Sequence, residues 1–359
     1  MTDSALSDWL SRLQSQHPVE IDLGLERVSA VARAMELIPA PIPTLTVAGT
    51  NGKGSVVAVL SSVLSAGDCR VGSYTSPHLV RFNERICVNG SSVGDQDLLA
   101  AFNAIEVARG EISLTYFEVA TLASLWIFRK HEVDVQVLEV GLGGRLDAVN
   151  IIDADLAIIT SIGLDHTDWL GDDRELIALE KAEVSRPGRP CVVAEHDPPD
   201  SLRCRLDDIG AQVSWISKDW ILESPYVVTS SGSRYLLPEN EGLLPQNVGA
   251  AVEALERSDV ISVTQSLLDA TNSIGLPGRL SVRQYQDMNV LMDVAHNAES
   301  VRVLVHRLRA SPVTGKTRAI FGVMGDKPIH DMLSACSSVV DEWNLVDLSH
   351  VERAASLDD

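Results

Sequence analysis

Apolar and polar positions follow two alternating spacings along the chain, one typical of strands and one typical of helices. Apolar runs of strand length occupy residues 44–48 (TLTVA), 133–140 (VDVQVLEV) and 155–160 (DLAIIT). Between them, apolar residues recur every three or four positions, as in residues 55–66 and 174–184, which predicts helices. Strands that alternate with helices indicate an α/β fold with a mainly parallel sheet covered on both faces.

The same alternation begins again after residue 275. The pattern predicts a strand and loop over residues 289–297, strands near 318–324 and 343–348, and helices over 299–310 and 328–340. We therefore expect two domains, at residues 1–275 and 276–359, of which the second is much smaller. Residues 215–244 have weak periodicity, and the pattern assigns no element to them.

Composition and charge narrow the function classes. The chain has 359 residues, of which 45% are hydrophobic and 22% are charged, as in globular proteins. A net charge of −21 argues against nucleic acid bound through a broad basic surface. No apolar leader begins the chain and no apolar run reaches membrane-spanning length. The five cysteines form no C-x-x-C pair, which is typical of reduced thiols in a cytoplasmic protein.

The stretch TVAGTNGKGSVVAVL, at residues 46–60, predicts a phosphate-binding loop. A strand that turns through glycines into a helix directs backbone N–H groups at an anion, and Lys53 adds a positive charge. The stretch departs from the Walker A pattern G-x-x-x-x-G-K-[ST]. Val47 stands at the first glycine position, and Gly54 separates Lys53 from Ser55. A plain glycine turn is the alternative.

Three polar residues near expected strand ends are candidate metal ligands. Glu139 lies inside an apolar run just before a glycine-rich loop, where an unpartnered carboxylate is costly. His166 follows a strand in TSIGLDHTDWLG, and Ser76 precedes a proline in YTSPHLVRFNER. A carboxylate, an imidazole and a hydroxyl at the ligand-bearing edge of a sheet can hold Mg²⁺ against phosphate oxygens. Taken singly, each has an alternative: a solvated glutamate, an ordinary loop histidine and a turn serine.

Five motifs, in a fixed order along the chain, resemble those of the Mur-ligase-like ATP-dependent amide ligases. The resemblance is to the folate branch of this family, the bacterial bifunctional dihydrofolate synthase/folylpolyglutamate synthases. The motifs are GTNGKGS, SPHLVRFNER, LEVGLGGRLDAVN, SIGLDHTDWLG and DVAHN, and the resemblance extends from Asp22 to the last residues. The inserted Gly54 matches the Gly-Lys-Gly-Ser loop of the folate ligases. The resemblance implies a P-loop ATPase-like first domain and a Rossmann-like second domain, which we expect to be incomplete beside its relatives.

The resemblance also implies the reaction. Such ligases add L-glutamate to dihydropteroate, which gives dihydrofolate, and to tetrahydrofolate glutamates. ATP phosphorylates the substrate carboxylate, and the amine of glutamate attacks the acyl phosphate. The implied cofactors are ATP and Mg²⁺, as two ions, with room for a monovalent cation. The implied partners are small molecules (7,8-dihydropteroate, folates and L-glutamate) bound by a monomer, without nucleic acid or membrane.

By the same resemblance, each role falls on particular residues. Asn51, Gly52, Lys53 and Gly54 hold the ATP phosphates, and Asn247, Arg279 and Asp293 hold its base and ribose. Ser76, Glu139 and His166 bind magnesium, and Lys53, His166 and a carbamylated Lys181 serve catalysis. The residues for dihydropteroate are Asp22, Leu23, Gly24, Leu25, Thr115, Tyr116, Phe117, Glu118, Leu146, Asp147 and Ala148. Phe117 would stack on the pterin and Asp147 would accept its hydrogen bonds; a core aromatic and a loop-capping carboxylate are the alternatives.

Other functions stay open at this point. A folylpolyglutamate synthase without the dihydropteroate activity would share the same ATP machinery. A cell-wall Mur ligase shares the architecture, although Gly54 and the FNER sequence argue against it. A kinase or nucleotide-driven switch with a phosphate loop would need neither an amine acceptor nor the DVAHN motif.

Overall fold

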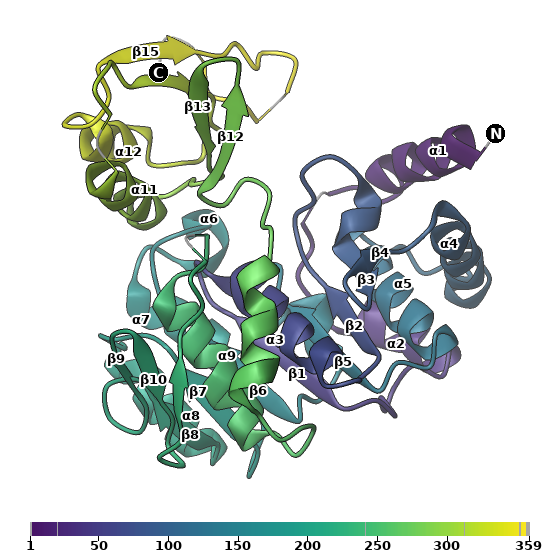
Figure 1. Cartoon of the computed structure of the whole chain (residues 1–359). Helices are drawn as coiled ribbons and strands as arrows, with labels where there is room; N and C mark the ends of the chain where they lie inside the picture. The colour runs from purple at the N-terminus through teal and green to yellow at the C-terminus, as the bar shows by residue number, and fades with distance from the viewer. Residues whose placement is uncertain (1, 20, 241, 312, 352, 357–359) are drawn as a thin grey trace. The chain divides into compact units, whose positions relative to one another are not determined.

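The structure is a computed structural model that describes residues 2–19, 21–240, 242–311, 313–351 and 353–356 (Figure 1). Contacts between Cα atoms divide the chain into two compact units. The first unit comprises residues 1–162 and 173–274, and the second comprises residues 163–172 and 275–359.

The first unit is built on a sheet of eight strands. Their order across the sheet is β4-β3-β2-β5-β1-β6-β7-β8. The strands are β1 (Thr44–Ala48), β2 (Val71–Tyr74), β3 (Ile86–Val88), β4 (Ser91–Ser92), β5 (Val135–Glu139), β6 (Leu156–Ile159), β7 (Pro190–Val193) and β8 (Gln212–Trp215). The pairs from β2 to β8 across the sheet are all parallel, and only the edge formed by β3 and β4 is antiparallel. The expected mainly parallel sheet is therefore confirmed.

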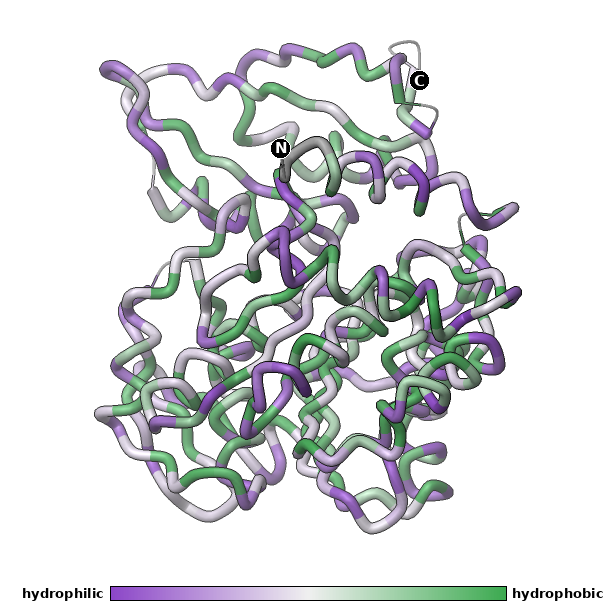
Figure 2. The backbone as a smooth tube through the Cα atoms, turned by 90° about the vertical axis from the view of Figure 1, so that its right-hand side faces the viewer, coloured by the Kyte–Doolittle hydropathy of each residue, from purple (hydrophilic) through white to green (hydrophobic). Residues whose placement is uncertain are grey.

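Helices of the first unit pack on the sheets or on one another. They are α1 (Thr2–Ser15), α2 (Glu26–Ala34), α3 (Lys53–Ala66), α4 (Asp95–Arg109), α5 (Tyr116–Lys130), α7 (Arg174–Ala182), α8 (Asp200–Ile209), α9 (Pro245–Arg257) and α10 (Gln265–Leu268). Short 3₁₀ helices are η1 (Phe82–Arg85), η2 (Ala148–Ile151) and η3 (Asp269–Ser273). Helix α3 contacts β1, β2 and β5, and α9 contacts β6 and β7. These helices cover the continuous apolar strands, and every residue of β1, β2, β5 and β6 is buried. Figure 2 shows the hydropathy of each residue along the backbone.

Residues 215–244, which the sequence pattern left without an element, contain a second small sheet. Strands β9 (Ile221–Glu223), β10 (Tyr226–Val228) and β11 (Arg234–Leu236) form an antiparallel meander beside α9. The buried carboxylate of Glu253 on α9 accepts hydrogen bonds from the hydroxyls of Ser214 and Ser230, both at 2.6 Å. A polar network thus joins the meander, the large sheet and α9.

The second unit is a smaller α/β assembly. Strands β12 (Ser281–Tyr285) and β13 (Met288–Met292) form an antiparallel hairpin, and β14 (Arg318–Phe321) and β15 (Glu342–Leu345) pair in parallel. Helices α11 (Ala298–Ala310) and α12 (Ile329–Cys336) pack on each other, and the short α6 (Thr167–Leu170) belongs to this unit. Val301, Val305, Met332 and Cys336 form its buried core. The elements predicted after residue 275 are all present.

Two findings bear on the expectations from composition. All five cysteines are free thiols, as their spacing predicted. Within the described residues, no helix combines the length and apolar character that crossing a lipid bilayer requires.

Candidate active site

The glycine-rich loop connects β1 to α3 at the carboxyl edge of the parallel sheet. Gly52 adopts φ of 87° and precedes α3 without a side-chain cap, so the amide groups of the first helical turn can face an anion. A Cβ on Gly52 would lie 2.6 Å from Oδ1 of Asn247, so only glycine fits there. Asn247 is buried, and its Oδ1 accepts no hydrogen bond from the described residues. A buried polar atom beside the loop suits the predicted nucleotide contact.

Two hydroxyl residues at the end of β6 hold this loop in place. The N–H of Thr50 donates to the carbonyl of Ser161, and the N–H of Asn51 donates to the Ser161 hydroxyl, both at 2.9 Å. The hydroxyl of Thr160 donates to the carbonyl of Asn51 at 2.6 Å. Neither hydroxyl residue was predicted from the sequence, although Thr160 ends an expected strand and Ser161 follows it directly in the TSIGLDH motif.

Lys53 lies at the start of α3. Its Nζ donates to the carbonyl of Gly49 at 2.9 Å and to that of Thr50 at 3.2 Å. These bonds hold the ammonium group against the loop that the sequence predicts to bind phosphate.

Ser76 and Glu139 meet at the same edge of the sheet. They follow β2 and end β5, which are adjacent parallel strands. The N–H of Ser76 donates to Oε2 of Glu139 at 3.3 Å, and Glu139 is only 2% exposed. A carboxylate this deeply buried at a ligand-bearing edge fits the predicted role in binding a divalent cation.

Lys181 lies on α7 and is buried, with 4% of its surface exposed. The helix is tied to the glycine-rich loop after β5, because the N–H of Arg145 donates to the carbonyl of Glu180 at 2.9 Å. The guanidinium of Arg145 also pairs with the Glu180 carboxylate at 2.9 Å. Lys181 is therefore no solvated surface lysine, and it stands beside the loop that follows Glu139.

Asp147 organises the loop between β5 and β6. Its carboxylate accepts hydrogen bonds from the N–H groups of Gly141 at 3.0 Å, Leu142 at 2.8 Å and Val149 at 2.9 Å. Burial raises the pKa of Asp147 to about 6, against the opposing effects of these N–H groups and of the Lys53 cation. The carboxylate thus caps the loop, and its role toward dihydropteroate stays a prediction. Leu146 and Ala148 flank it in the same loop.

The other predicted dihydropteroate segments lie at the starts of two helices. Thr115 caps α5 in a capping box with Glu118, whose carboxylate accepts from the Thr115 N–H at 2.7 Å. Phe117 lies against Gly141 and packs on Tyr74, with ring centroids 5.9 Å apart. These contacts place the start of α5 beside the Asp147 loop.

Residues 22–25 precede α2 and are joined to the same region by Arg27. Its guanidinium pairs with the side chain of Asp22 at 2.6 Å and with Glu118 at 3.3 Å. The segments 22–25 and 115–118, which are far apart in the sequence, are therefore connected in the first unit. Arg27 was not among the residues predicted from the sequence.

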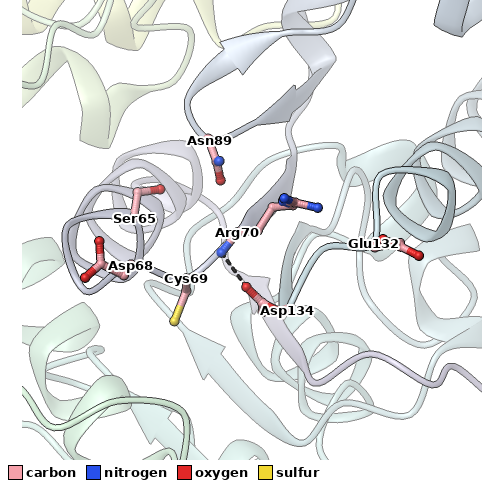
Figure 3. Close-up of a pocket in the computed structure, with 7 residues that line it drawn as sticks. All are labelled: Ser65, Asp68, Cys69, Arg70, Asn89, Glu132 and Asp134. Carbon is pink, nitrogen blue, oxygen red and sulfur yellow. Dashed lines mark hydrogen bonds between the residues drawn. The ribbon is translucent and has the colours of Figure 1, made fainter.

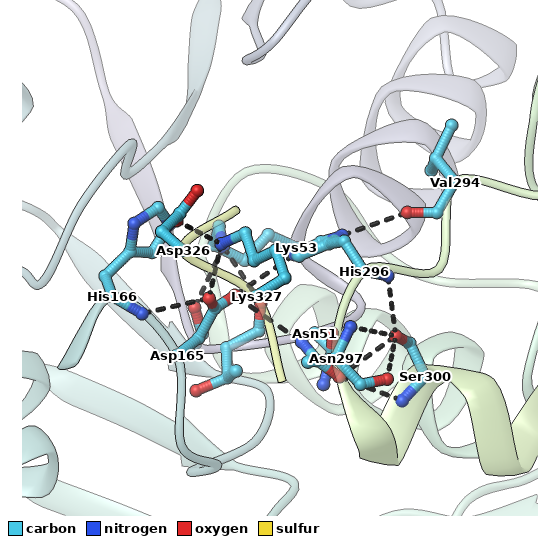
Figure 4. Close-up of polar contacts among 12 residues, drawn as sticks. Asn51, Lys53, Asp165, His166, Val294, His296, Asn297, Ser300, Asp326 and Lys327 are labelled. Atoms are coloured by element: carbon cyan, nitrogen blue, oxygen red, sulfur yellow. Dashed lines mark hydrogen bonds and ion pairs between the residues drawn. The ribbon is translucent and has the colours of Figure 1, made fainter. Parts of the chain in front are cut away.

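In the second unit, Asp165 is the centre of a polar cluster (Figure 4). Its carboxylate pairs with Nζ of Lys327 at 2.8 Å, with Nε2 of His296 at 3.1 Å, and with Nδ2 of Asn297 at 3.4 Å. Burial acts against the charge, but these donors outweigh it and hold the pKa of Asp165 far below its usual value. The N–H of His166 also donates to Asp165, at 2.9 Å.

His166 adopts a left-handed conformation, with φ of 51°, at the start of α6. Asp165 fixes the backbone there and joins the predicted metal ligand to the DVAHN motif. Neither Asp165 nor Lys327 was among the residues that the sequence singled out.

Arg279 and Asp293 lie near each other around the hairpin of the second unit. The Asp293 carboxylate accepts from the N–H groups of Leu280 at 2.7 Å and Ala295 at 2.8 Å. Burial raises the pKa of Asp293, while these bonds and the Arg279 cation act in the opposite direction. Asn297 caps α11, and its Oδ1 accepts from the N–H of Ser300 at 2.9 Å.

The chemistry of the predicted metal ligands fits a divalent cation. Within the described residues, no group of three or more His, Cys, Asp and Glu side chains is arranged to hold a metal ion. The predicted set contains only two such side chains, Glu139 and His166, with the hydroxyl of Ser76 as the third ligand. Hard cations take oxygen ligands of this kind.

A different polar hollow lies at the amino ends of β2 and β5, away from these loops (Figure 3). Arg70 donates its N–H to the Asp134 carboxylate there, at 2.7 Å. Burial and the nearby charges of Asp134 and Asp68 raise the pKa of the Cys69 thiol. The thiol is therefore protonated at neutral pH, and the hollow lacks an activated nucleophile.

Known proteins with similar sequences and structures agree with one family. Residues 47–217 match the Mur ligase middle domain, and residues 278–359 match the Mur ligase glutamate ligase domain. The chain is 43% identical to a dihydrofolate synthase/folylpolyglutamate synthase of Escherichia coli over 346 residues, which cover 95% of this chain and 81% of that protein. The corresponding protein of Haemophilus influenzae is 36% identical over 96% of this chain and 83% of its own length.

Solved structures show the same similarity. A structure of E. coli FolC in complex with DHPP and ADP superposes with a TM-score of 0.92 at 42% identity, over 98% of this chain and 86% of that one. A bifunctional folylpolyglutamate synthase/dihydrofolate synthase with Mn, AMPPNP and L-glutamate bound gives a TM-score of 0.90 over 98% of this chain and 85% of that one. The chain belongs to the dihydrofolate synthase/folylpolyglutamate synthase family of Mur ligases.

Proposed function

We propose that the chain is an ATP-dependent ligase that joins L-glutamate to dihydropteroate and to tetrahydrofolate glutamates. The observation that carries this is the meeting of three features at one sheet edge of the first unit: the uncapped glycine loop with Lys53, the buried Glu139 beside Ser76, and the Asp147 loop against Phe117. Such an edge supplies a phosphate cradle next to a surface for a flat apolar ligand.

Each group has a task in this reaction. The loop amides and Lys53 bind and orient the phosphates of ATP, and they neutralise the charge that develops during phosphoryl transfer. Ser76, Glu139 and His166 are the proposed ligands of Mg²⁺, and a second ion and a monovalent cation complete the proposed set. A bound divalent ion supplies charge neutralisation between phosphate and carboxylate. We propose that Lys181 carries a carbamate, which its burial beside the Asp147 loop supports.

The remaining assignments follow from the same family. Asn247, Arg279 and Asp293 would hold the base and ribose of ATP, and the segments 22–25, 115–118 and 146–148 would hold the pterin. We also propose a cytoplasmic monomer that acts on small molecules, with domains divided at residue 275.

The deciding experiment measures ADP release and analyses the product by mass. ADP should form only when L-glutamate and an acceptor are both present, and the acceptor should gain one glutamate. Dihydropteroate and tetrahydrofolate are tested separately, because use of tetrahydrofolate alone would mean a folylpolyglutamate synthase without the first activity. ADP release that needs no glutamate would contradict the ligase assignment.

A further inference from the structure

One buried arginine next to the predicted site has no carboxylate partner within the part of the chain that the structure describes. Arg85 ends η1 and is 9% exposed. Among the described residues, it forms no ion pair with any aspartate or glutamate. The carboxylate of its neighbour Glu84 is used elsewhere, since it accepts from the N–H groups of Leu79 at 2.8 Å and Arg81 at 2.7 Å.

The groups around Arg85 do not cancel its charge. Its Nε donates to Nδ1 of His78 at 2.8 Å, and this accepting nitrogen carries no proton, so the histidine supplies no negative charge. The guanidinium lies 5.7 Å from the ring centre of Phe82 and 5.5 Å from that of Tyr116. Aromatic faces attract a cation and hold the guanidinium plane, but they leave its full charge in place. A buried cation without an anion is costly, which indicates that an anionic ligand completes the pair.

Backbone contacts place Arg85 between the two halves of the predicted site. The N–H of Thr75 donates to the carbonyl of Arg85 at 2.8 Å, so Arg85 is paired with the residue before Ser76. Ser76 in turn contacts Glu139. On its other side, Arg85 touches Tyr116 in the segment predicted to bind dihydropteroate. The carboxylate of the acceptor must lie between the pterin surface and the phosphate loop, because phosphate is transferred to it.

We propose that Arg85 binds the carboxylate of the acceptor substrate, the same group that becomes the acyl phosphate. This inference rests on the proposed function and adds a substrate-binding residue to it. The guanidinium would orient the carboxylate by charge and by paired N–H donors, with its plane set by Phe82, Tyr116 and His78.

The test compares two ligands that differ only in charge. Binding of pteroate and of its uncharged carboxamide is measured by fluorescence titration, with the protein saturated with a non-hydrolysable ATP analogue. The parent should prefer the carboxylate by roughly 10- to 100-fold, as expected for a charge-assisted contact. Arg85→Met should lose most of this preference, and Arg85→Lys should keep part of it.

The control is Arg81→Met, which removes an exposed arginine of the same loop that pairs with Asp95 at 3.1 Å. It should keep the parental preference. Affinity for the ATP analogue and the KM for L-glutamate should be unchanged in Arg85→Lys. If Arg85→Met does not fold, Arg85→Lys alone decides, because its point charge cannot reproduce the paired donors.

Two results would overturn the inference. One is an undiminished carboxylate preference in the Arg85 variants. The other is a rise in the KM for L-glutamate without loss of that preference, which would assign Arg85 to the incoming amino acid. If the parent itself releases no ADP with dihydropteroate and glutamate, it is the proposed function that fails, which is a separate outcome.

Discussion

At the scale of single residues, the phosphate loop depends on one ammonium group held by backbone carbonyls. Lys53 is bonded to Gly49 and Thr50, so its charge is fixed close to the mouth of the loop. A cation that is already positioned stabilises developing negative charge without reorganisation.

We expect Lys53→Ala to lower kcat by roughly 10²–10³-fold, which is the usual effect of removing one donor that stabilises charge in the transition state. The fold should persist, because the side chain contributes little apolar burial. Steady-state ADP release and far-UV circular dichroism check both expectations. Parental turnover in a folded variant would remove Lys53 from the phosphate site.

Asp147 gives a prediction about pH. Its pKa is raised to about 6 in the folded protein, so the folded state binds the proton more tightly than the unfolded chain does. Its contribution to stability is therefore present at low pH and is lost as the pH rises from about 4 to about 6. The loss is about 3 kcal/mol for a shift of this size.

The matched variant is Asp147→Asn, which cannot ionise. Urea unfolding at pH 4 and pH 7 should show that the parent loses up to about 3 kcal/mol relative to the variant between the two values. Other titrating groups are common to both proteins and cancel in the difference. A constant difference between parent and variant would mean that folding does not raise the pKa of Asp147.

At the scale of elements, the junction between β1 and the loop is closely packed against β6. Gly49 has φ of 147°, and a Cβ there would lie 1.8 Å from the Thr160 hydroxyl oxygen. We expect Gly49→Ala to lower the free energy of unfolding by about 1–3 kcal/mol, as overpacking does, and to displace the loop. Chemical unfolding and titration with an ATP analogue measure the two effects.

Gly94→Ala is the control for this substitution. Gly94 precedes α4 with φ of −74°, and an added Cβ would meet nothing within 4 Å. Alanine is less favourable than glycine at a helix N-cap, so the control should itself lose about 0.5–1 kcal/mol, but it should leave the phosphate loop and the affinity for the ATP analogue unchanged. If both variants unfold at the same urea concentration, the close approach of Thr160 has no energetic consequence.

The sequence predicted the central strands because each is a continuous apolar run between two helices. Strand β1 coincides with the run TLTVA, and its five residues are all buried. Strands β9, β10 and β11 were missed because each is only three residues long and half buried. Their arrangement depends on the buried Glu253, and such a tertiary contact leaves no periodic pattern in the sequence.

In the candidate site too, the sequence predicted the residues that lie in motifs and missed those that act through tertiary contacts. Motif order located the glycine loop, Ser76 and Glu139, and strand adjacency then explains why they share one edge. Thr160 and Ser161 were not foreseen, since a hydroxyl that braces a loop resembles any other hydroxyl in sequence. Arg27 and Arg85 were missed for a related reason. Arg27 pairs with Glu118, which is distant in sequence, and Arg85 pairs with no carboxylate among the described residues, and neither property is visible in the sequence.

At the scale of the whole molecule, the segment between β6 and α7 belongs to the second unit, although the elements on both sides of it belong to the first. Residues 163–172 belong with residues 275–359 by their contacts, although they interrupt the first unit in sequence. One of the contacts that join this segment to the second unit is the buried pair of Asp165 with Lys327, each side chain 9% exposed. Such a pair is invisible to sequence patterning, because 162 positions separate its members.

Lys327→Met should therefore release this segment from the second unit. It would leave the buried Asp165 carboxylate with His296, Asn297 and the N–H of His166 but without its lysine cation, and breaking one side of a buried pair costs about 3–5 kcal/mol. We expect a lower unfolding temperature for the second unit and faster proteolytic cleavage within residues 163–172.

Lys316→Met is the matched control, since Lys316 pairs with Glu342 at an exposed site in the same unit, where ion pairs contribute about 0–1 kcal/mol. Because His166 follows Asp165 and takes its backbone position from it, Mn²⁺ affinity should also fall in Lys327→Met and not in the control. Equal proteolysis of both variants would show that the segment is held by other contacts and that the Asp165 pair does not anchor it.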